Sequence, residues 1–316
     1  MTTVVALAGG IGAGKFLRGL VRVVAPEDVT VVVNTGDDIV LYGLHVAPDL
    51  DSVTYWLGGV MDRERGWGRD AETFRATEEL RAFGADGAWF GLGDLDLATH
   101  VFRTQVLSAG GTLTDATAAV AARFGVGSRL LPMTDDPVVT RIDVVDDDGV
   151  ELDLHFQEYW VRRGGAGDVK GVRFDGVEAA RPAPGVVEAL ASADAVILCP
   201  SNPVVSIGPI LAVPGIRDAV AARRDHVAGV SPIVGGMPVR GMADRLMPAA
   251  GVEVSAAGAA DCYRGLLSGW VIDEQDRGLA SRIQDTIERV SVMDTIMTDD
   301  ASAETLARAA LELALP

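Results

Sequence analysis

The stretch T-V-V-A-L-A-G-G-I-G-A-G-K-F-L-R-G-L-V-R-V-V, residues 3–24, decides the fold class. It begins with a short apolar run rich in β-branched residues, continues through the glycines of residues 9–14 and ends with apolar residues at helical spacing. This order predicts a buried strand, a glycine-rich turn and a helix. A second β-branched run, residues 29–33, predicts a strand buried on both faces, as in a parallel sheet. We therefore expect an α/β protein with a Rossmann-like, mainly parallel sheet flanked by helices.

The glycines of the first turn match two phosphate-binding motifs only in part. Residues 9–15 agree with a P-loop until its last position, where Phe16 replaces the Ser or Thr that would bind magnesium. Gly10 and Gly12 fit the dinucleotide fingerprint, but Lys15 stands where its third glycine belongs. A glycine turn beside a helix amino terminus still favours an anion, although a purely structural turn is the alternative. The predicted phosphate-binding residues here are Gly9, Gly10, Gly12 and Lys15.

Four aspartates lie close together in residues 33–51, V-N-T-G-D-D-I-V-L-Y-G-L-H-V-A-P-D-L-D. Asp37 and Asp38 follow the strand predicted at 29–33, and open α/β sheets bind ligands at the carboxyl ends of their strands. Asp49 and Asp51 fall at the start of a predicted helix, where one of them could be only an N-cap. Each aspartate alone is best read as a cap or a solvated turn residue, but four together favour a metal or phosphate site.

Further candidate residues follow later strands. Ser201, Asn202 and Ser206 come after the buried strand predicted at 195–198, and their short polar side chains suit a phosphate or a base edge. Arg240 is a candidate phosphate ligand because a guanidinium group can fork onto two oxygens.

Two further stretches complete the pattern of candidate sites. His100 and Arg103 share one face of a predicted helix, where a surface salt-bridging pair is the ordinary expectation. Glycines at 91 and 93 beside Asp94 and Asp96 predict a second edge of the site.

The domain organisation is predicted from one antiparallel pattern inside the parallel one. Alternating residues at 138–145 and 150–156, joined by an Asp-Asp-Asp-Gly turn, predict a β-hairpin. We expect residues 1–133 and 184–316 to form the two parts of a Rossmann-like core, and residues 134–183 to form a smaller inserted subdomain. An amphipathic closing helix is predicted near the carboxyl end.

Composition excludes several classes of partner. The net charge of −18 argues against nucleic acid, because a protein that binds phosphates of DNA or RNA needs a basic face. Only Lys15 and Lys170 are lysines, a bias typical of high-salt adaptation or of a high-GC genome. The two cysteines, Cys199 and Cys262, allow no disulfide framework. Neither a signal peptide nor a membrane-spanning run is visible, so we expect a cytoplasmic protein with no membrane partner.

An ordered set of motifs then resembles a known family. The set comprises A-G-G-I-G-A-G-K at 8–15, N-T-G-D-D at 34–38, A-P-D-L-D at 47–51, L-G-D-L-D-L-A-T-H at 92–100, L-P-M-T-D-D-P at 131–137, H-F-Q-E-Y-W at 155–160, P-S-N-P-V-V-S-I-G-P-I at 200–210 and S-P-I-V-G-G-M-P-V-R-G at 231–241. In this combination the chain resembles the 2-phospho-L-lactate transferase (CofD) family of coenzyme F420 biosynthesis.

The resemblance implies a Mg²⁺-dependent transferase that acts on small molecules. The acceptor would be the deazaflavin Fo (7,8-didemethyl-8-hydroxy-5-deazariboflavin), and the donor lactyl-diphosphoguanosine or enolpyruvyl-diphosphoguanosine, with GMP as the second product. Habitat favours the lactyl donor, because low lysine and high acidity point to a halophilic archaeon. The family also implies a homodimer.

The resemblance also suggests residue roles. Asp51 would contact Fo and act as catalytic base, and Asp37 would be the second catalytic residue. Metal ligands would come from Asp37, Asp38 and Asp49. The remaining predicted Fo contacts are Gly91, Asp38 and Trp89.

Two other functions remain open at this stage. A nicotinamide-dependent oxidoreductase could use the same glycine turn with Asp37 as its ribose ligand, although the third glycine is missing. A YvcK-like regulator that binds nucleotide sugars would share the fold. The motifs on the acceptor side, P-D-L-D at 48–51 and H-F-Q-E-Y-W at 155–160, favour the transferase.

Overall fold

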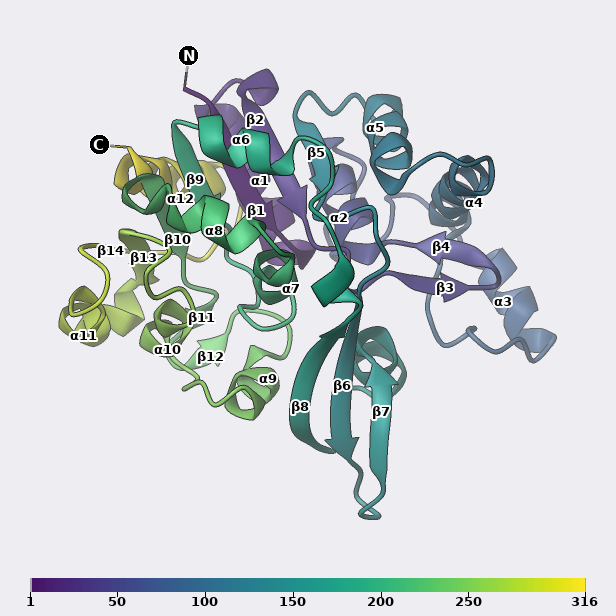
Figure 1. Cartoon of the computed structure of the whole chain (residues 1–316). Helices are drawn as coiled ribbons and strands as arrows, with labels where there is room; N and C mark the ends of the chain where they lie inside the picture. The colour runs from purple at the N-terminus through teal and green to yellow at the C-terminus, as the bar shows by residue number, and fades with distance from the viewer. Residues whose placement is uncertain (1, 316) are drawn as a thin grey trace.

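A seven-stranded parallel sheet forms the centre of the protein in the computed structural model, which describes residues 2–315 (Figure 1). In spatial order its strands are β14 (Arg289–Met293), β13 (Gly269–Asp273), β10 (Val227–Val230), β9 (Ala195–Leu198), β1 (Val4–Ala8), β2 (Val29–Val33) and β5 (Arg129–Pro132). The chain builds outward from β1 through β2 to β5, then returns to the other side of β1 with β9. The order of strands therefore reverses between β1 and β9, and such switch points are where open sheets bind ligands.

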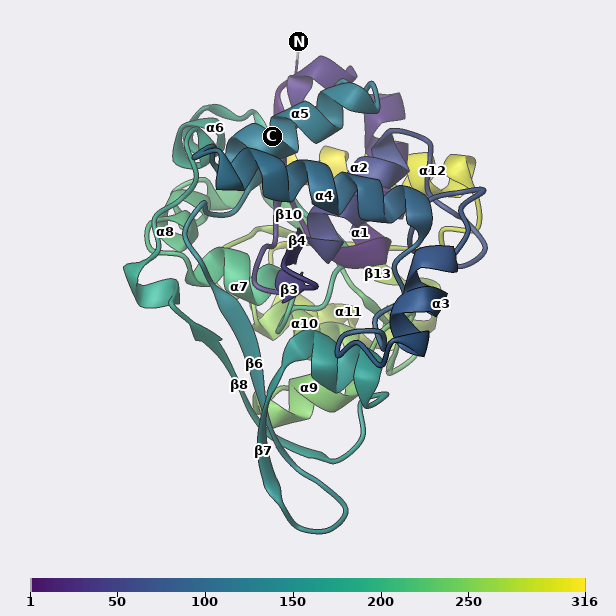
Figure 2. The same cartoon turned by 90° about the vertical axis from the view of Figure 1, so that its right-hand side faces the viewer.

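Helices cover both faces of this sheet (Figures 1 and 2). Alternate residues of β1 explain the two layers: Val4, Ala6 and Ala8 pack in one core, whereas Val5 and Leu7 pack in the other. The helices are α1 (Gly10–Val23), α2 (Pro48–Leu57), α3 (Arg75–Ala82), α4 (Asp94–Ser108), α5 (Leu113–Arg123), α6 (Val186–Ser192), α7 (Ile207–Ala212), α8 (Ile216–Ala221), α9 (Ala243–Ala249), α10 (Ala256–Asp261), α11 (Ala280–Gln284) and α12 (Asp300–Ala314). The prediction of a Rossmann-like parallel sheet flanked by helices is confirmed.

A separate antiparallel sheet of three strands projects from the core and extends downwards in Figure 2. It contains β6 (Val139–Val145), β7 (Glu151–His155) and β8 (Asp168–Asp175), in the order β7-β6-β8. The predicted hairpin is therefore present and gains a third strand, while the domain boundaries at 133 and 184 stay a prediction. Two short hairpins, β3 (Ile39–Leu41) with β4 (Leu44–Val46) and β11 (Ile233–Val234) with β12 (Met237–Pro238), complete the strands.

The projecting sheet is attached to the loop that follows β2. The Thr140 backbone N–H donates to the Gly36 carbonyl oxygen at 2.6 Å, and the His155 Nε2 lies 3.0 Å from the Asp38 carbonyl oxygen. Burial lowers the pKa of His155, which favours the neutral imidazole, and its Nδ1 accepts from the Gln157 backbone N–H. Nε2 is then the protonated nitrogen and donates to Asp38. The sheet thus supports the acidic turn from outside.

Two local expectations are wrong. Helix α1 already begins at Gly10, so most of the predicted glycine turn belongs to the helix itself. The N-cap of α2 is Ala47, so neither Asp49 nor Asp51 caps that helix, and both carboxylates are free for other contacts.

Every helix within residues 2–315 is too short or too polar to span a bilayer.

Candidate active site

A cavity of about 640 Å³ opens where the central strands end. Loops that follow β1, β2, β9, β10 and β14 contribute lining residues, and the first turns of α1 and α2 contribute others. The cavity therefore occupies the switch point of the sheet, as expected for a ligand site in an open α/β fold.

Most of the predicted site residues line this one cavity. They are Gly9, Gly10, Gly12, Lys15, Asp37, Asp49, Asp51, Gly91, Ser201, Asn202, Ser206 and Arg240. Asp38 and Trp89 lie outside the lining. Their immediate neighbours Asp37 and Phe90 face the cavity instead, because adjacent residues of an extended or turning chain point in different directions.

The floor of the cavity joins the loops after β1 and β9. The Ser201 hydroxyl donates to the Gly9 carbonyl oxygen at 2.8 Å, which closes the floor between the two strands. A Cβ at Gly9 would lie 2.8 Å from Asp49 Oδ2, and a Cβ at Gly12 would lie 2.5 Å from the Pro200 carbonyl oxygen. Glycine is therefore required for close packing at these positions. This floor presents the amino terminus of α1 to the cavity, where its free N–H groups favour an anion.

Asp37 and Asp49 form an acidic pair beside this floor. Burial, and then repulsion by Asp49, raises the pKa of Asp37 well above its ordinary value. Burial also raises the pKa of Asp49 to about 7, with a further contribution from Asp38, although a hydrogen bond from Asn34 at 2.9 Å opposes the shift. Within residues 2–315, Asp37 Oδ1 has no hydrogen-bond partner. The pair therefore lacks a neutralising cation of its own.

Asp38 belongs to a different environment. Its Oδ2 lies 2.8 Å from His45 Nε2, which comes from β4. Burial raises the pKa of Asp38, and the hydrogen bond and charge of His45 counteract that effect. Asp38 therefore helps to hold the β3–β4 hairpin against the acidic turn rather than facing the cavity.

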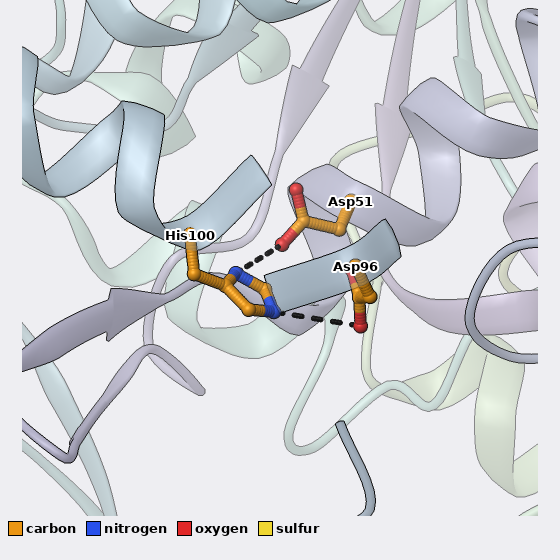
Figure 3. Close-up of side chains that lie close together, drawn as sticks. All are labelled: Asp51, Asp96 and His100. Carbon is orange, nitrogen blue, oxygen red and sulfur yellow. Dashed lines mark ion pairs between the residues drawn. The ribbon is translucent and has the colours of Figure 1, made fainter. Parts of the chain in front are cut away.

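A second polar cluster lies between α2 and α4. Both carboxylate oxygens of Asp51 accept from Arg103, and Nη1 of that guanidinium lies 3.1 Å from Oδ2. His100 stands between two carboxylates, with Nδ1 at 3.5 Å from Asp51 Oδ2 and Nε2 at 3.4 Å from Asp96 Oδ2 (Figure 3). The Tyr55 hydroxyl donates to Asp96 Oδ1 at 2.6 Å. All five side chains are buried.

Hydrogen bonds and ion pairs offset the burial of this second cluster. Burial opposes ionisation of Asp96, but His100, Tyr55 and Arg103 together outweigh it and hold the pKa of Asp96 below its ordinary value. Burial likewise disfavours the charged form of Arg103, but Asp51 outweighs it and raises the arginine pKa. The lowered pKa of Asp96 favours its ionised form, and the Arg103 guanidinium is paired with Asp51.

The sequence-based expectation for His100 and Arg103 is wrong. Instead of a surface pair, both side chains are about 1% exposed and contact Asp51, which lies some fifty residues earlier in the chain. The spacing of His100 and Arg103 places them on one face of the helix. The neighbouring Asp96 was the signal in the sequence that this face could be buried and polar. Only the fold reveals that α2 covers it.

Aromatic side chains and a cation surround the mouth. Trp67, Phe90 and Trp160 line the cavity, and the two tryptophans are partly exposed. Arg240 also lines it, and its Nη2 donates to the carbonyl oxygen of Arg65 at 2.8 Å. The site thus combines flat apolar walls with cationic groups, of which Lys15 is another.

Each cluster suits a different chemical task. Buried carboxylates fit Mg²⁺, which prefers oxygen ligands. Asp37 and Asp49 line the cavity and could hold such an ion, and Asp37 Oδ1 has no hydrogen-bond partner among residues 2–315. Asp51, Asp96 and His100 each offer a ligand atom within 4.8 Å of the others, but the Arg103 guanidinium already supplies the cation there. The arrangement as a whole can bind a metal-complexed phosphate beside a hydrogen-bonding organic molecule.

Comparisons with known proteins show which proteins this chain is similar to. The family model described as 2-phospho-L-lactate transferase CofD matches residues 4–311. A phosphoenolpyruvate transferase from Streptomyces griseus is 52% identical over 312 residues, which cover 98% of both chains. One from Mycolicibacterium smegmatis is 41% identical over 323 residues, covering 98% of this chain and 97% of the relative. A solved UPF0052-family structure from Bacillus halodurans has a TM-score of 0.63 at 16% identity, covers 98% of this chain and 99% of that one, and shows the fold alone.

Proposed function

The chain belongs to the CofD family of 2-phospho-L-lactate transferases, and we propose that it transfers a phosphoenolpyruvyl group from enolpyruvyl-diphosphoguanosine to Fo. At the family level it is a phosphoenolpyruvate or phospholactate transferase of coenzyme F420 biosynthesis. The observation that carries the finer proposal is the pairing of two unlike carboxylate clusters across one cavity at the switch point of the sheet. One cluster suits a metal-bound diphosphate, and the other suits a hydroxyl-rich acceptor.

The relatives favour the enolpyruvyl donor over the lactyl donor that habitat suggested. Proteins 41–52% identical to this chain over nearly its whole length are named phosphoenolpyruvate transferase. They come from actinobacteria such as Streptomyces, and a high-GC genome also accounts for a chain with only two lysines, Lys15 and Lys170. The low lysine content therefore no longer favours a halophilic source, and with it the lactyl donor.

We assign the donor to the floor of the cavity. Phosphate oxygens would accept from the free N–H groups at the start of α1, and Lys15 and Arg240 would add positive charge. Asp37 and Asp49 would hold Mg²⁺, which when bound neutralises charge on the diphosphate. We favour these two residues over Asp38, because Asp38 lies outside the cavity lining and its Oδ2 is paired with His45.

We assign the acceptor to the other side, with its flat ring against the aromatic residues of the mouth. Its terminal hydroxyl would attack the phosphorus that carries enolpyruvate, forming a P–O bond while the bridging P–O bond to GMP breaks. Asp51 would accept the hydrogen bond of this hydroxyl and finally its proton. A weak base held by Arg103 is sufficient, because phosphoryl transfer passes through a loose transition state in which orientation matters more than deprotonation.

Mass spectrometry of the product tests the proposal directly. Purified protein would be incubated with Fo, MgCl₂ and each donor in turn. The enolpyruvyl product is lighter than the lactyl product by a pair of hydrogen atoms, so the two transfers are distinguished by mass. GMP release that is independent of Fo, or faster turnover of the lactyl donor, would contradict the proposal.

Variants test the residue roles. We expect Asp51→Asn and Asp37→Asn to lose transfer while they remain folded, and the matched control Asp218→Asn, on the exposed surface of α8, to keep wild-type activity. Omission of Mg²⁺, or its replacement by EDTA, is expected to abolish turnover. The homodimer stays a prediction that light scattering of the purified protein tests.

A further inference from the structure

His100 carries a buried nitrogen that the protein leaves without a hydrogen-bond partner. Its side chain lines the cavity and is about 1% exposed. Nε2 lies 3.4 Å from Asp96 Oδ2, an ion-pair contact whose geometry does not make a hydrogen bond, and no other group among the described residues supplies a hydrogen-bond partner. A buried polar atom of this kind is costly unless a ligand completes it.

The neighbours of His100 determine which nitrogen carries the proton. Nδ1 lies 3.2 Å from Arg103 Nη1, and a guanidinium group only donates, so Nδ1 accepts this hydrogen bond. The neutral ring then carries its proton on Nε2. Nε2 is therefore a donor and offers no lone pair to a ligand.

A donor nitrogen excludes His100 itself as a metal ligand. Asp51, Asp96 and His100 have the spacing of a metal site, but a protonated Nε2 cannot ligate an ion. The cation of the cluster is the Arg103 guanidinium, which is paired with Asp51. The missing partner of Nε2 is therefore a hydrogen-bond acceptor.

Charge selects the type of acceptor atom. The carboxylates of Asp51 and Asp96 flank His100 on both sides (Figure 3), so a phosphate oxygen would be repelled. An uncharged hydroxyl or carbonyl oxygen meets no such repulsion. Of the two proposed substrates, Fo carries oxygens of this kind without phosphate.

We propose that His100 contacts the substrate directly by donating a hydrogen bond from Nε2 to an uncharged oxygen of the acceptor. Arg103 is the positioning residue, because it fixes both Asp51 and the ring of His100. This inference rests on the proposed function. It gives His100 a role in selecting an acceptor that places an uncharged oxygen atom next to Nε2.

The experiment measures acceptor binding without turnover. Fo fluorescence would be titrated with the full-length protein in the absence of donor. We expect His100→Leu to weaken Fo binding by about 10- to 100-fold, the loss of one buried hydrogen bond. His100→Gln retains an amide donor and is expected to recover most of the affinity. The matched control His226→Leu, which changes a histidine outside the cavity, is expected to bind like wild type.

A second measurement uses the wild-type protein and does not depend on the folding of a variant. With isotope-labelled histidine, the Nε2–H signal of His100 is expected to shift and to exchange more slowly with solvent when Fo is added. For Arg103→Lys we expect a raised KM for Fo with an unchanged KM for the donor, because lysine cannot hold Asp51 with two parallel bonds.

The outcomes separate the inference from the function on which it rests. If the wild-type protein does not bind Fo, the proposed function is wrong. If the wild-type protein binds Fo but folded His100→Leu binds equally well, or the Nε2–H signal is unchanged by Fo, only the role of His100 is wrong.

Discussion

Replacement of Asp49 by asparagine is expected to stabilise the ligand-free protein while it removes activity. The Asp49 carboxylate is buried near Asp37, whose charge it repels, and no ion pair joins it to a cation among residues 2–315. Asparagine is nearly the same size, and its carbonyl oxygen can accept the hydrogen bond that Asn34 now donates at 2.9 Å. The substitution therefore removes an unfavourable charge, although it gives up the hydrogen bond that the Gly10 backbone N–H donates to the carboxylate.

The pKa of Asp49 gives the sign and the magnitude. Burial raises it from 3.8 to about 7, so between these values the folded protein binds a proton that the unfolded chain has released. The free energy of unfolding therefore falls as pH rises through this window, by roughly 1.4 kcal/mol per pH unit and about 4 kcal/mol in total. The Asp49→Asn variant has no titrating carboxyl group at this position, so it does not lose this stability as pH rises. At pH 8 we expect the free energy of unfolding of Asp49→Asn to exceed that of the wild-type protein by about 1–4 kcal/mol, and its Tm to be higher.

Urea unfolding without Mg²⁺ at pH 5 and pH 8 tests this reasoning. The free energy of unfolding of Asp49→Asn, relative to that of the wild-type protein, should be larger at pH 8 than at pH 5. The control Asp300→Asn should lose stability instead, because Arg18 lies 2.6 Å from Asp300 and lowers its pKa. If Asp49→Asn were less stable than wild type at pH 8, the carboxylate would be stabilised by a group that we have not identified, and its assignment to a metal would fail.

Three further outcomes are expected. Arg103→Leu should lower the free energy of unfolding by about 3–5 kcal/mol because it leaves Asp51 buried and unpaired, and in urea titrations the double variant with Asp51→Leu should recover most of that loss. Gly12→Ala should be destabilised by about 1–3 kcal/mol and bind the donor more weakly by calorimetry, since its Cβ would lie 2.5 Å from the Pro200 carbonyl oxygen. Mg²⁺ affinity, measured by calorimetry, should fall by up to about tenfold per pH unit below pH 7, where Asp49 takes up a proton that competes with the ion.

The sheet could be predicted because its signals are local. The β-branched runs at 4–8 and 29–33 are long enough to specify buried strands, and both pair in parallel register. Asp37 and Asp49 were also accessible to sequence reasoning, since strand ends and helix starts converge at one edge of an open sheet. Their presence in one cavity agrees with that expectation, and their chemical roles stay a prediction.

The second cluster could not be predicted because its cause is not local. Arg103 is buried only because Asp51 meets it across the contact of α2 with α4. A lone arginine on a helix looks like a surface residue, and no spacing rule links positions so far apart. Asp38 illustrates a related difficulty: a pattern of two adjacent aspartates cannot say which one faces the cavity, and here Asp38 is paired with His45. Its predicted roles as a metal ligand and an Fo contact stay predictions.

The hydrogen bond from Ser201 to Gly9 has a consequence for the newly made chain. It joins residues 192 positions apart, so the floor of the cavity cannot close until β9 has docked beside β1. An amino-terminal fragment that emerges first during synthesis carries the glycines and both aspartates of the acidic pair, yet it lacks the β9 side of the cavity floor. We therefore expect a chain that ends before residue 201 to bind no donor and to have no transferase activity.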